Sequence, residues 1–178
     1  LYPRLAWQGI TKNRRLYLPF LLTCIGMVMM TYILLSLASS PVLKTFPGGD
    51  TMPMILSLGS IVMAAFAVLF LFYTNSFLIR RRNREFGLYN ILGMGKGNLA
   101  KVLAWETVMM ALISVVSGEA LGILLGKLFE LLLVNIVGGD VKMDFTVSGP
   151  SVAMTTILYL AIFVLLFLRS LVTVCRTN

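Results

Sequence analysis

Long apolar blocks without charges alternate with short polar segments along the whole chain. Four blocks are long enough to cross a bilayer as helices, because a hydrocarbon core about 30 Å thick needs about 20 residues. We expect the spans at about residues 16–40, 55–79, 99–134 and 150–168. The third block is too long for a simple perpendicular crossing, so it should tilt, bend near Gly118 or protrude. The pattern predicts an all-α integral membrane protein with four transmembrane helices.

The second and third spans are separated by the most strongly charged stretch of the chain, residues 80–97. Four of the fifteen basic residues fall within its first five positions. Each charge would cost roughly 2.5–3.5 kcal/mol in hydrocarbon, so this stretch must lie in water or among headgroups. A short helix here would also present an apolar ridge, made of Phe86, Leu88, Tyr89, Ile91 and Leu92. Such a ridge needs a membrane surface or a protein partner, and a docking element is favoured.

Residues 1–15 have the pattern of an amphipathic helix lying in the inner membrane interface. Its apolar side contrasts with an opposite side formed by Arg4, Gln8, Thr11 and Arg15. A tryptophan at position 7 is a natural anchor at headgroup level. Such a helix could serve as a mechanical elbow, and an ordinary positively charged lead-in to the first span is about as good an explanation.

The charge distribution gives an orientation. With 58% hydrophobic and 12% charged residues, the chain lies outside the range of soluble globular proteins. Segments 1–15 and 80–98 hold nine basic residues and one acid, whereas 41–53 and 135–149 hold two basic and three acidic residues. The positive-inside rule therefore places both termini and the 80–97 stretch in the cytoplasm. The net charge of +8 then reflects anionic membrane lipid rather than nucleic acid as a partner.

Enzymatic chemistry is largely excluded by residue types. The chain has no His, no zinc-ligand cluster and no convincing nucleophile arrangement. Cys24 and Cys175 lie in or beside different apolar spans, and no disulfide between them is expected. Residues 93–97 resemble a phosphate loop only superficially, because their spacing is wrong and Asn98 follows. We expect no catalytic residue, metal or cofactor in this chain.

Ionisable residues inside a membrane are candidates for function, and the third span contains Glu119. On a helical wheel, Gly122, Gly126 and Glu130 lie within about 60° of it. Gly118, Gly122 and Gly126 form two overlapping G-x-x-x-G spacings, which let another helix approach closely. Packing and positioning are favoured over a direct role in gating or ligand response, which stays open.

The other charges of this span have simpler interpretations. Lys127 and Glu130 stand three positions apart and can pair on one helix face near the outer surface. Glu106 follows Trp105 near the inner end of the span. We interpret Glu106 as an interfacial anchor beside that tryptophan.

The stretch Arg-Glu-Phe-Gly-Leu-Tyr-Asn-Ile-Leu-Gly at 84–93 resembles the cytoplasmic segment of FtsX-like ABC transporter permeases. Residues 72–79 and 85–96 look closely like the bacitracin- and lantibiotic-resistance (BceB-type) branch of that superfamily, and residues 13–20 are similar too. The resemblance covers essentially the whole chain. Members of this branch have ten spans and a large extracellular domain between the seventh and eighth, and this chain resembles their first four spans.

The resemblance implies a non-catalytic permease subunit in the bacterial plasma membrane. The 80–97 stretch would contact a separate dimeric ATPase that binds ATP and Mg. The residues carried over to that contact are Arg84, Glu85, Phe86, Gly87, Leu88, Tyr89, Leu92 and Gly93. In the family this work frees lipid-cycle intermediates from peptide antibiotics, and often signals to a membrane histidine kinase.

Two alternatives stay open. One is another FtsX-like role, such as lipoprotein release or regulation of cell-wall hydrolases. The other is a small proton-coupled exporter that uses Glu119 as its proton site and needs no ATPase. The exporter predicts that Glu119→Gln abolishes activity while changes at Glu85 are harmless, and the ABC interpretation predicts the reverse emphasis.

Overall fold

The computed structural model describes residues 1–45, 47–137 and 147–176, and its elements there are all helical. In chain order they are α1 (Tyr2–Lys12), α2 (Arg14–Ala38), the 3-10 helix η1 (Pro41–Thr45), α3 (Met52–Ile91), α4 (Lys96–Val137) and α5 (Gly149–Arg176). The last four α-helices are each long and apolar enough to cross a membrane. The prediction of an all-α membrane protein with four spans is confirmed.

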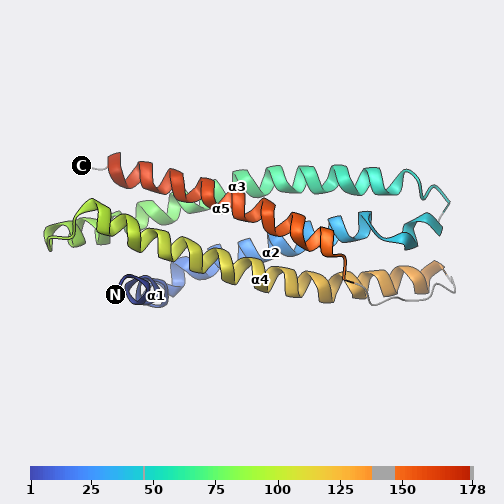
Figure 1. Ribbon diagram of the computed structural model, residues 1–178, viewed down its shortest axis with the longest axis horizontal. Helices are drawn as coiled ribbons and strands as arrows, with labels where there is room; N and C mark the ends of the chain where they lie inside the picture. Colours follow the sequence, from blue (N-terminus) through green and yellow to red (C-terminus); the bar gives the residue numbers. More distant parts are fainter. Residues whose placement is uncertain (46, 138–146, 177–178) are drawn as a thin grey trace.

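The four long helices run up and down along one axis (Figure 1). Both ends of the chain and the α3–α4 turn lie at the same end of this bundle, and the α2–α3 connection lies at the other. An even number of spans requires this arrangement. We call the end with the termini the inner end, following the charge-based prediction of orientation.

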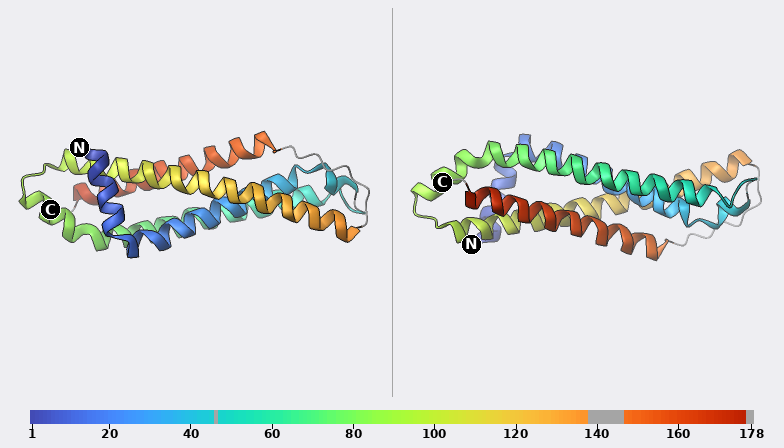
Figure 2. Two further views of the ribbon diagram at one scale, coloured as in Figure 1. Left: turned by 90° about the horizontal axis from the view of Figure 1, so that it is seen from below. Right: turned by 90° about the horizontal axis from the view of Figure 1, so that it is seen from above.

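α1 runs across the inner end of the bundle instead of along it (Figure 2). Ala6 is fully buried in the middle of α1, while Arg4, Gln8 and Thr11 are exposed on its other side. The Tyr2 hydroxyl donates a hydrogen bond of 3.0 Å to an oxygen of the Asn98 side chain on α4. The two-sided pattern of residues 1–15 is therefore used to pack α1 against the bundle.

α3 and α4 are much longer than the spans predicted within them. α3 has 40 residues and α4 has 42, which at 1.5 Å per residue is about 60 Å, roughly twice the hydrocarbon core. Residues 80–91 continue α3 and do not form a separate short helix, because neither proline nor a glycine turn interrupts them. The helix ends where Gly93 takes a positive φ of 89°, a conformation that suits glycine. α4 is continuous through Gly118.

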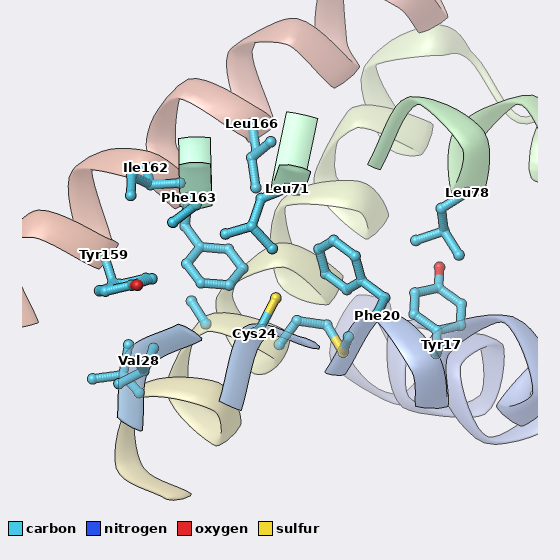
Figure 3. Close-up of a cluster of buried hydrophobic side chains, with 14 residues drawn as sticks. Tyr17, Phe20, Cys24, Val28, Leu71, Leu78, Tyr159, Ile162, Phe163 and Leu166 are labelled. Atoms are coloured by element: carbon cyan, nitrogen blue, oxygen red, sulfur yellow. The ribbon is translucent and has the colours of Figure 1, made fainter. Parts of the chain in front are cut away.

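The core is built around α2, which packs mainly against α3 and α4, with α5 completing the bundle (Figure 3). A continuous apolar cluster joins all four helices, with Phe20 and Val28 from α2, Leu71 from α3, Met110 from α4 and Phe163 from α5 among its members. Two hydrogen bonds between helices add to this packing, the buried one between Thr31 and Tyr159 at 2.8 Å and the partly buried one from Asn75 to Ser170 at 2.9 Å. This core fixes where the inner ends of α3 and α4 emerge.

The second predicted outer loop lies mostly outside the described residues. Its charged residues Asp140, Lys142 and Asp144, together with Gly138 and Gly139, fall within 138–146. Its slightly acidic character stays a prediction from the sequence. The first outer loop contains η1 and turns at Gly48, whose φ is +86°.

Candidate functional site

The α3–α4 hairpin projects from the inner end of the bundle (Figure 1). Its tip carries exposed apolar side chains. Leu88, Ile91 and Leu92 are 57%, 84% and 72% exposed. Exposed basic residues stand beside them, Arg84 on α3 and Lys96 at the start of α4. Three of the five residues of the apolar ridge expected from the sequence are thus exposed at the end of α3, whereas Phe86 is buried and Tyr89 is half-buried.

The eight residues assigned to ATPase contact do not share one environment. Five of them are exposed: Arg84, Gly87, Leu88, Leu92 and Gly93. Glu85 and Tyr89 are half-buried, and Phe86 is buried. Phe86 packs in a small cluster with Leu99 and Leu103 of α4 and Val174 of α5. The structure therefore divides the predicted set into an exposed tip and an internal support.

A buried charge pair lies in the bundle behind this hairpin. The guanidinium of Arg82, on α3, donates hydrogen bonds to a carboxylate oxygen of Glu106, on α4, and to the hydroxyl of Tyr17, on α2. The same hydroxyl donates to Glu106 at 3.0 Å. The side chains of Arg82 and Glu106 are only 3% and 4% exposed. One triad of polar groups thus joins three helices.

Arg82 also links the charge pair to the predicted contact residues. Its guanidinium carbon lies 4.9 Å from the ring centroid of Phe86 and 5.5 Å from that of Tyr17, distances suited to cation–π contact. Its Nε lies 3.4 Å from a carboxylate oxygen of Glu85. The other oxygen of Glu85 accepts a 2.9 Å hydrogen bond from Asn13, at the junction of α1 and α2. The base of the hairpin is therefore hydrogen-bonded to the junction of α1 and α2.

The interpretation of Glu106 as an interfacial anchor was wrong. Trp105 is 45% exposed, but Glu106 is 3% exposed and points into the bundle. The pair with Arg82 joins residues 24 positions apart on two helices, and no local spacing signals such a contact. The burial of Arg82 cannot be recognised from the sequence either, because this residue stands in a run of arginines. The other members of the run, Arg80, Arg81 and Arg84, are exposed.

The glycines of the third span face α2. A Cβ on Gly118 would lie 2.6 Å from the Cβ of Val28, and one on Gly122 would lie 2.8 Å from Cδ1 of Tyr32. Both distances are shorter than real contacts allow, so these two positions require glycine at the present helix separation. Gly126 is looser, with 3.9 Å to Tyr32.

The acidic residues of the third span contact different partners. A carboxylate oxygen of Glu119 accepts a hydrogen bond of 2.6 Å from the Thr156 hydroxyl on α5. Lys127 and Glu130 form the expected pair at 3.0 Å. Glu130 also accepts a hydrogen bond of 2.9 Å from Ser40, just after α2. Glu119 therefore ties α4 to α5, whereas Glu130 ties α4 to the end of α2.

Comparison with known proteins identifies the family of the chain. Residues 57–178 match the family described as FtsX-like permease C-terminal. The chain belongs to the FtsX-like permeases. This match includes the α3–α4 hairpin, the charge pair and the glycines of α4, so the resemblance based on the sequence motifs is confirmed.

Individual relatives agree with this assignment. The chain is 28% identical over 169 residues to the bacitracin export permease protein BceB of Bacillus subtilis, and 27% identical over 169 residues to the ABC transporter permease YvcS of the same organism. Each alignment covers 94% of this chain and 26% of the relative. The ABC transporter permease protein YxdM, also from Bacillus subtilis, is 25% identical over 170 residues. The chain spans about a quarter of the length of these relatives.

The family, the relatives and the four apolar helices together make this a multi-pass protein of the bacterial plasma membrane, of the FtsX-like ABC transporter permease type.

Proposed function

We propose that the chain is the part of an ABC transporter permease that receives a separate ATPase dimer, and that the tip of the α3–α4 hairpin is the docking surface. The observation that carries this proposal is the tip itself. Leu88, Ile91 and Leu92 are more than half exposed at the end of a helix that extends about 60 Å from its start. Apolar side chains at such a place are explained by a protein partner that covers them.

The charges around the tip support a protein partner over the lipid surface. The tip is separated from the last apolar turn of the second span by Arg80, Arg81 and Arg84, which are exposed and mark the headgroup level. Leu88 to Leu92 lie beyond this level along α3. A ridge that inserts into the membrane would lie level with the arginines or on their N-terminal side, toward the second span. The tip instead lies one to three helical turns C-terminal to them.

Phe86 has a supporting role in this proposal. Its ring is 7% exposed and lies between the guanidinium of Arg82 and the apolar cluster with Leu99 and Leu103. A buried ring adjacent to an exposed ridge fixes the direction in which the ridge points. We therefore assign contact with the ATPase to the exposed members of the predicted set, and assign the shape of the surface to Phe86.

The nucleotide chemistry of this proposal resides in the partner, which binds ATP and Mg, while the permease transmits movement and performs no catalysis itself. The named relative BceB is a bacitracin export permease protein. We propose, by this likeness, a role in resistance to antimicrobial peptides such as bacitracin or lantibiotics. The ligand would be the peptide or the lipid-cycle intermediate it binds, and a membrane histidine kinase would be a further partner.

The test uses the full-length permease that contains this chain, co-expressed with its ATPase. Leu88→Asp combined with Ile91→Asp should remove the ATPase from the purified complex, because two charges would be buried without partners in the interface. Asn90→Asp is the matched control. It adds a charge at an exposed position of the same helical turn without altering the ridge, and should retain the ATPase. Retention of the ATPase by the double variant would overturn the docking assignment.

The same complex in proteoliposomes decides between ligands. Bacitracin or a lantibiotic, added with the lipid-cycle intermediate, should stimulate ATP hydrolysis by the complex with the unaltered permease. Stimulation by a lipoprotein substrate instead would favour the other FtsX-like role and contradict the antibiotic proposal. No change in hydrolysis with any peptide would also contradict it.

A further inference from the structure

The structure assigns Arg82 and Glu106 a positioning role: they pack against the backbone of α1 at Gly9 and, together with the hydrogen bonds at the two ends of α1, hold it to the base of the α3–α4 hairpin. A displacement of the hairpin then carries α1 with it. The cause of such a displacement, an ATPase acting on the tip, rests on the proposed function. The mechanical connection between α1 and the hairpin rests on the geometry alone.

The first step is that separating the two charges of the Arg82–Glu106 pair costs much free energy, because water cannot readily solvate them where they lie. Both side chains are almost fully buried, and the guanidinium is covered by the rings of Tyr17 and Phe86. Two buried charges attract strongly when they are hydrogen-bonded, and separating them leaves each without compensation. α3 and α4 are therefore held together at this level as a stiff unit, with Tyr17 attaching α2 to it.

The second step is that α1 contacts the pair directly. A Cβ placed on Gly9 would lie 2.8 Å from Oε1 of Glu106 and 3.3 Å from Nη2 of Arg82. The backbone of α1 thus approaches the two charged groups at the one position of this helix that has no side chain. Oε1 of Glu106 is buried and has no hydrogen-bond partner among the described residues, so it is this free oxygen that faces α1.

The third step is that two flanking contacts keep α1 in register. Asn13, where α1 meets α2, donates to Glu85 on the hairpin at 2.9 Å. Near the start of α1, Tyr2 donates to Asn98 on α4 at 3.0 Å, and the Lys101 ammonium lies 5.5 Å from the centroid of the Tyr2 ring. α1 is therefore attached at both ends and at its middle to residues of α3 and α4, and it cannot rotate or slide independently of them.

The arrangement explains why an amphipathic helix lies across the bundle at this level. A helix held in the membrane interface and fastened to the hairpin would spread a local push over the inner ends of α2, α3 and α4. This force is transmitted through the contact of Gly9 with the Arg82–Glu106 pair, which we call the joint.

The test measures the position of α1 relative to α3 in the full-length permease, alone and with its ATPase, in nanodiscs. Spin labels are placed at Gln8 and Arg80, two exposed positions away from the docking tip. The distance distribution is recorded by pulsed electron paramagnetic resonance without nucleotide and with ATP trapped. With the joint intact, we expect one narrow distribution that is the same in both states.

Gly9→Ala is the most informative variant, because it leaves both charges in place and only separates α1 from them. We expect the Gln8–Arg80 distribution to broaden or split. The matched control is Gly26→Ala on α2, where a Cβ meets nothing within 4 Å, and this variant should keep the narrow distribution. An unchanged distribution in Gly9→Ala would overturn the inference.

Arg82→Gln should broaden the distribution further, while Arg81→Gln, at an exposed neighbour, should not. Arg82→Lys should restore part of the narrow component, because it keeps the charge without the forked geometry. In the complex, ligand-stimulated turnover in Arg82→Gln should fall by about tenfold or more while the ATPase stays bound, since one partner of a buried pair is lost. A parallel loss of ATPase binding by a folded variant would show that Arg82 shapes the docking surface itself and would overturn a role in positioning α1.

The two proposals fail separately. If the unaltered permease retains no ATPase, the proposed function fails, but the distances in the permease alone still report the joint. If the ATPase binds and stimulation is normal while Gly9→Ala and Arg82→Gln leave α1 in place, only the inference about the joint fails.

Discussion

α4 contributes to two ion pairs that differ in burial, one in its inner half and one in its outer half. Arg82–Glu106, at the inner end, joins residues on different helices, with side chains 3% and 4% exposed. Lys127–Glu130, toward the outer end, joins residues three positions apart on one helix, and each side chain is 21% exposed. Both are salt bridges, yet their structural consequences differ.

The difference lies in what each pair holds together and in what replaces it when it breaks. When the outer pair breaks, water can solvate each of its two side chains, and the helical structure of α4 does not change. The inner pair is almost fully buried and connects α3 to α4, with α2 and α1 around it. At the outer half of α4 the connection to α2 is made by Gly118 and Gly122, through close backbone approach, and by the hydrogen bond that Ser40, just after α2, donates to Glu130.

The largest effect should come from Glu106→Gln. Arg82 would remain buried with its charge uncompensated except by Glu85, 3.4 Å from its Nε, so we expect a loss of about 3 kcal/mol in the free energy of unfolding. The measurement is denaturant unfolding of the full-length permease in detergent micelles. Glu130→Gln is the control and should cost less than about 1 kcal/mol. Equal losses in the two variants would contradict the comparison.

An intermediate effect is expected at the glycines that join α4 to α2. Gly118→Ala should destabilise the permease by about 1–3 kcal/mol, because the added methyl would lie 2.6 Å from Val28 and the helices must move apart. Gly126→Ala should be neutral or stabilising by up to about 1 kcal/mol, since its nearest neighbour lies at 3.9 Å and alanine favours helix. The same unfolding assay distinguishes them, and a loss at Gly126 matching that at Gly118 would show that close approach is not decisive.

The smallest effect is expected at Glu119. Glu119→Gln keeps a carbonyl oxygen that can accept the hydrogen bond from Thr156, so stability should change by less than about 0.5 kcal/mol. Peptide-stimulated ATP hydrolysis by the complex should also be retained. Loss of peptide-stimulated hydrolysis with the ATPase still bound would instead show a direct role of Glu119 in gating or ligand response.

The sequence by itself determined the spans, the two-sided elbow helix and the exposed apolar tip. Each of these depends on hydrophobic period and on the cost of burying charge, which act locally and can be read from neighbouring residues. The spacing of Gly118, Gly122 and Gly126 likewise indicated a close helix contact, and the three-residue spacing of Lys127 and Glu130 indicated their pairing.

Only the tertiary structure decided which charge is buried. Arg82 has the same side chain as its neighbours Arg80 and Arg81, and its burial follows from the direction it takes on α3 once α2 and α4 pack there. The burial of Glu106 depends on the same packing. Arg82 and Glu106 are 24 residues apart on two helices, so their pairing depends on how those helices pack. No local sequence pattern indicates that packing.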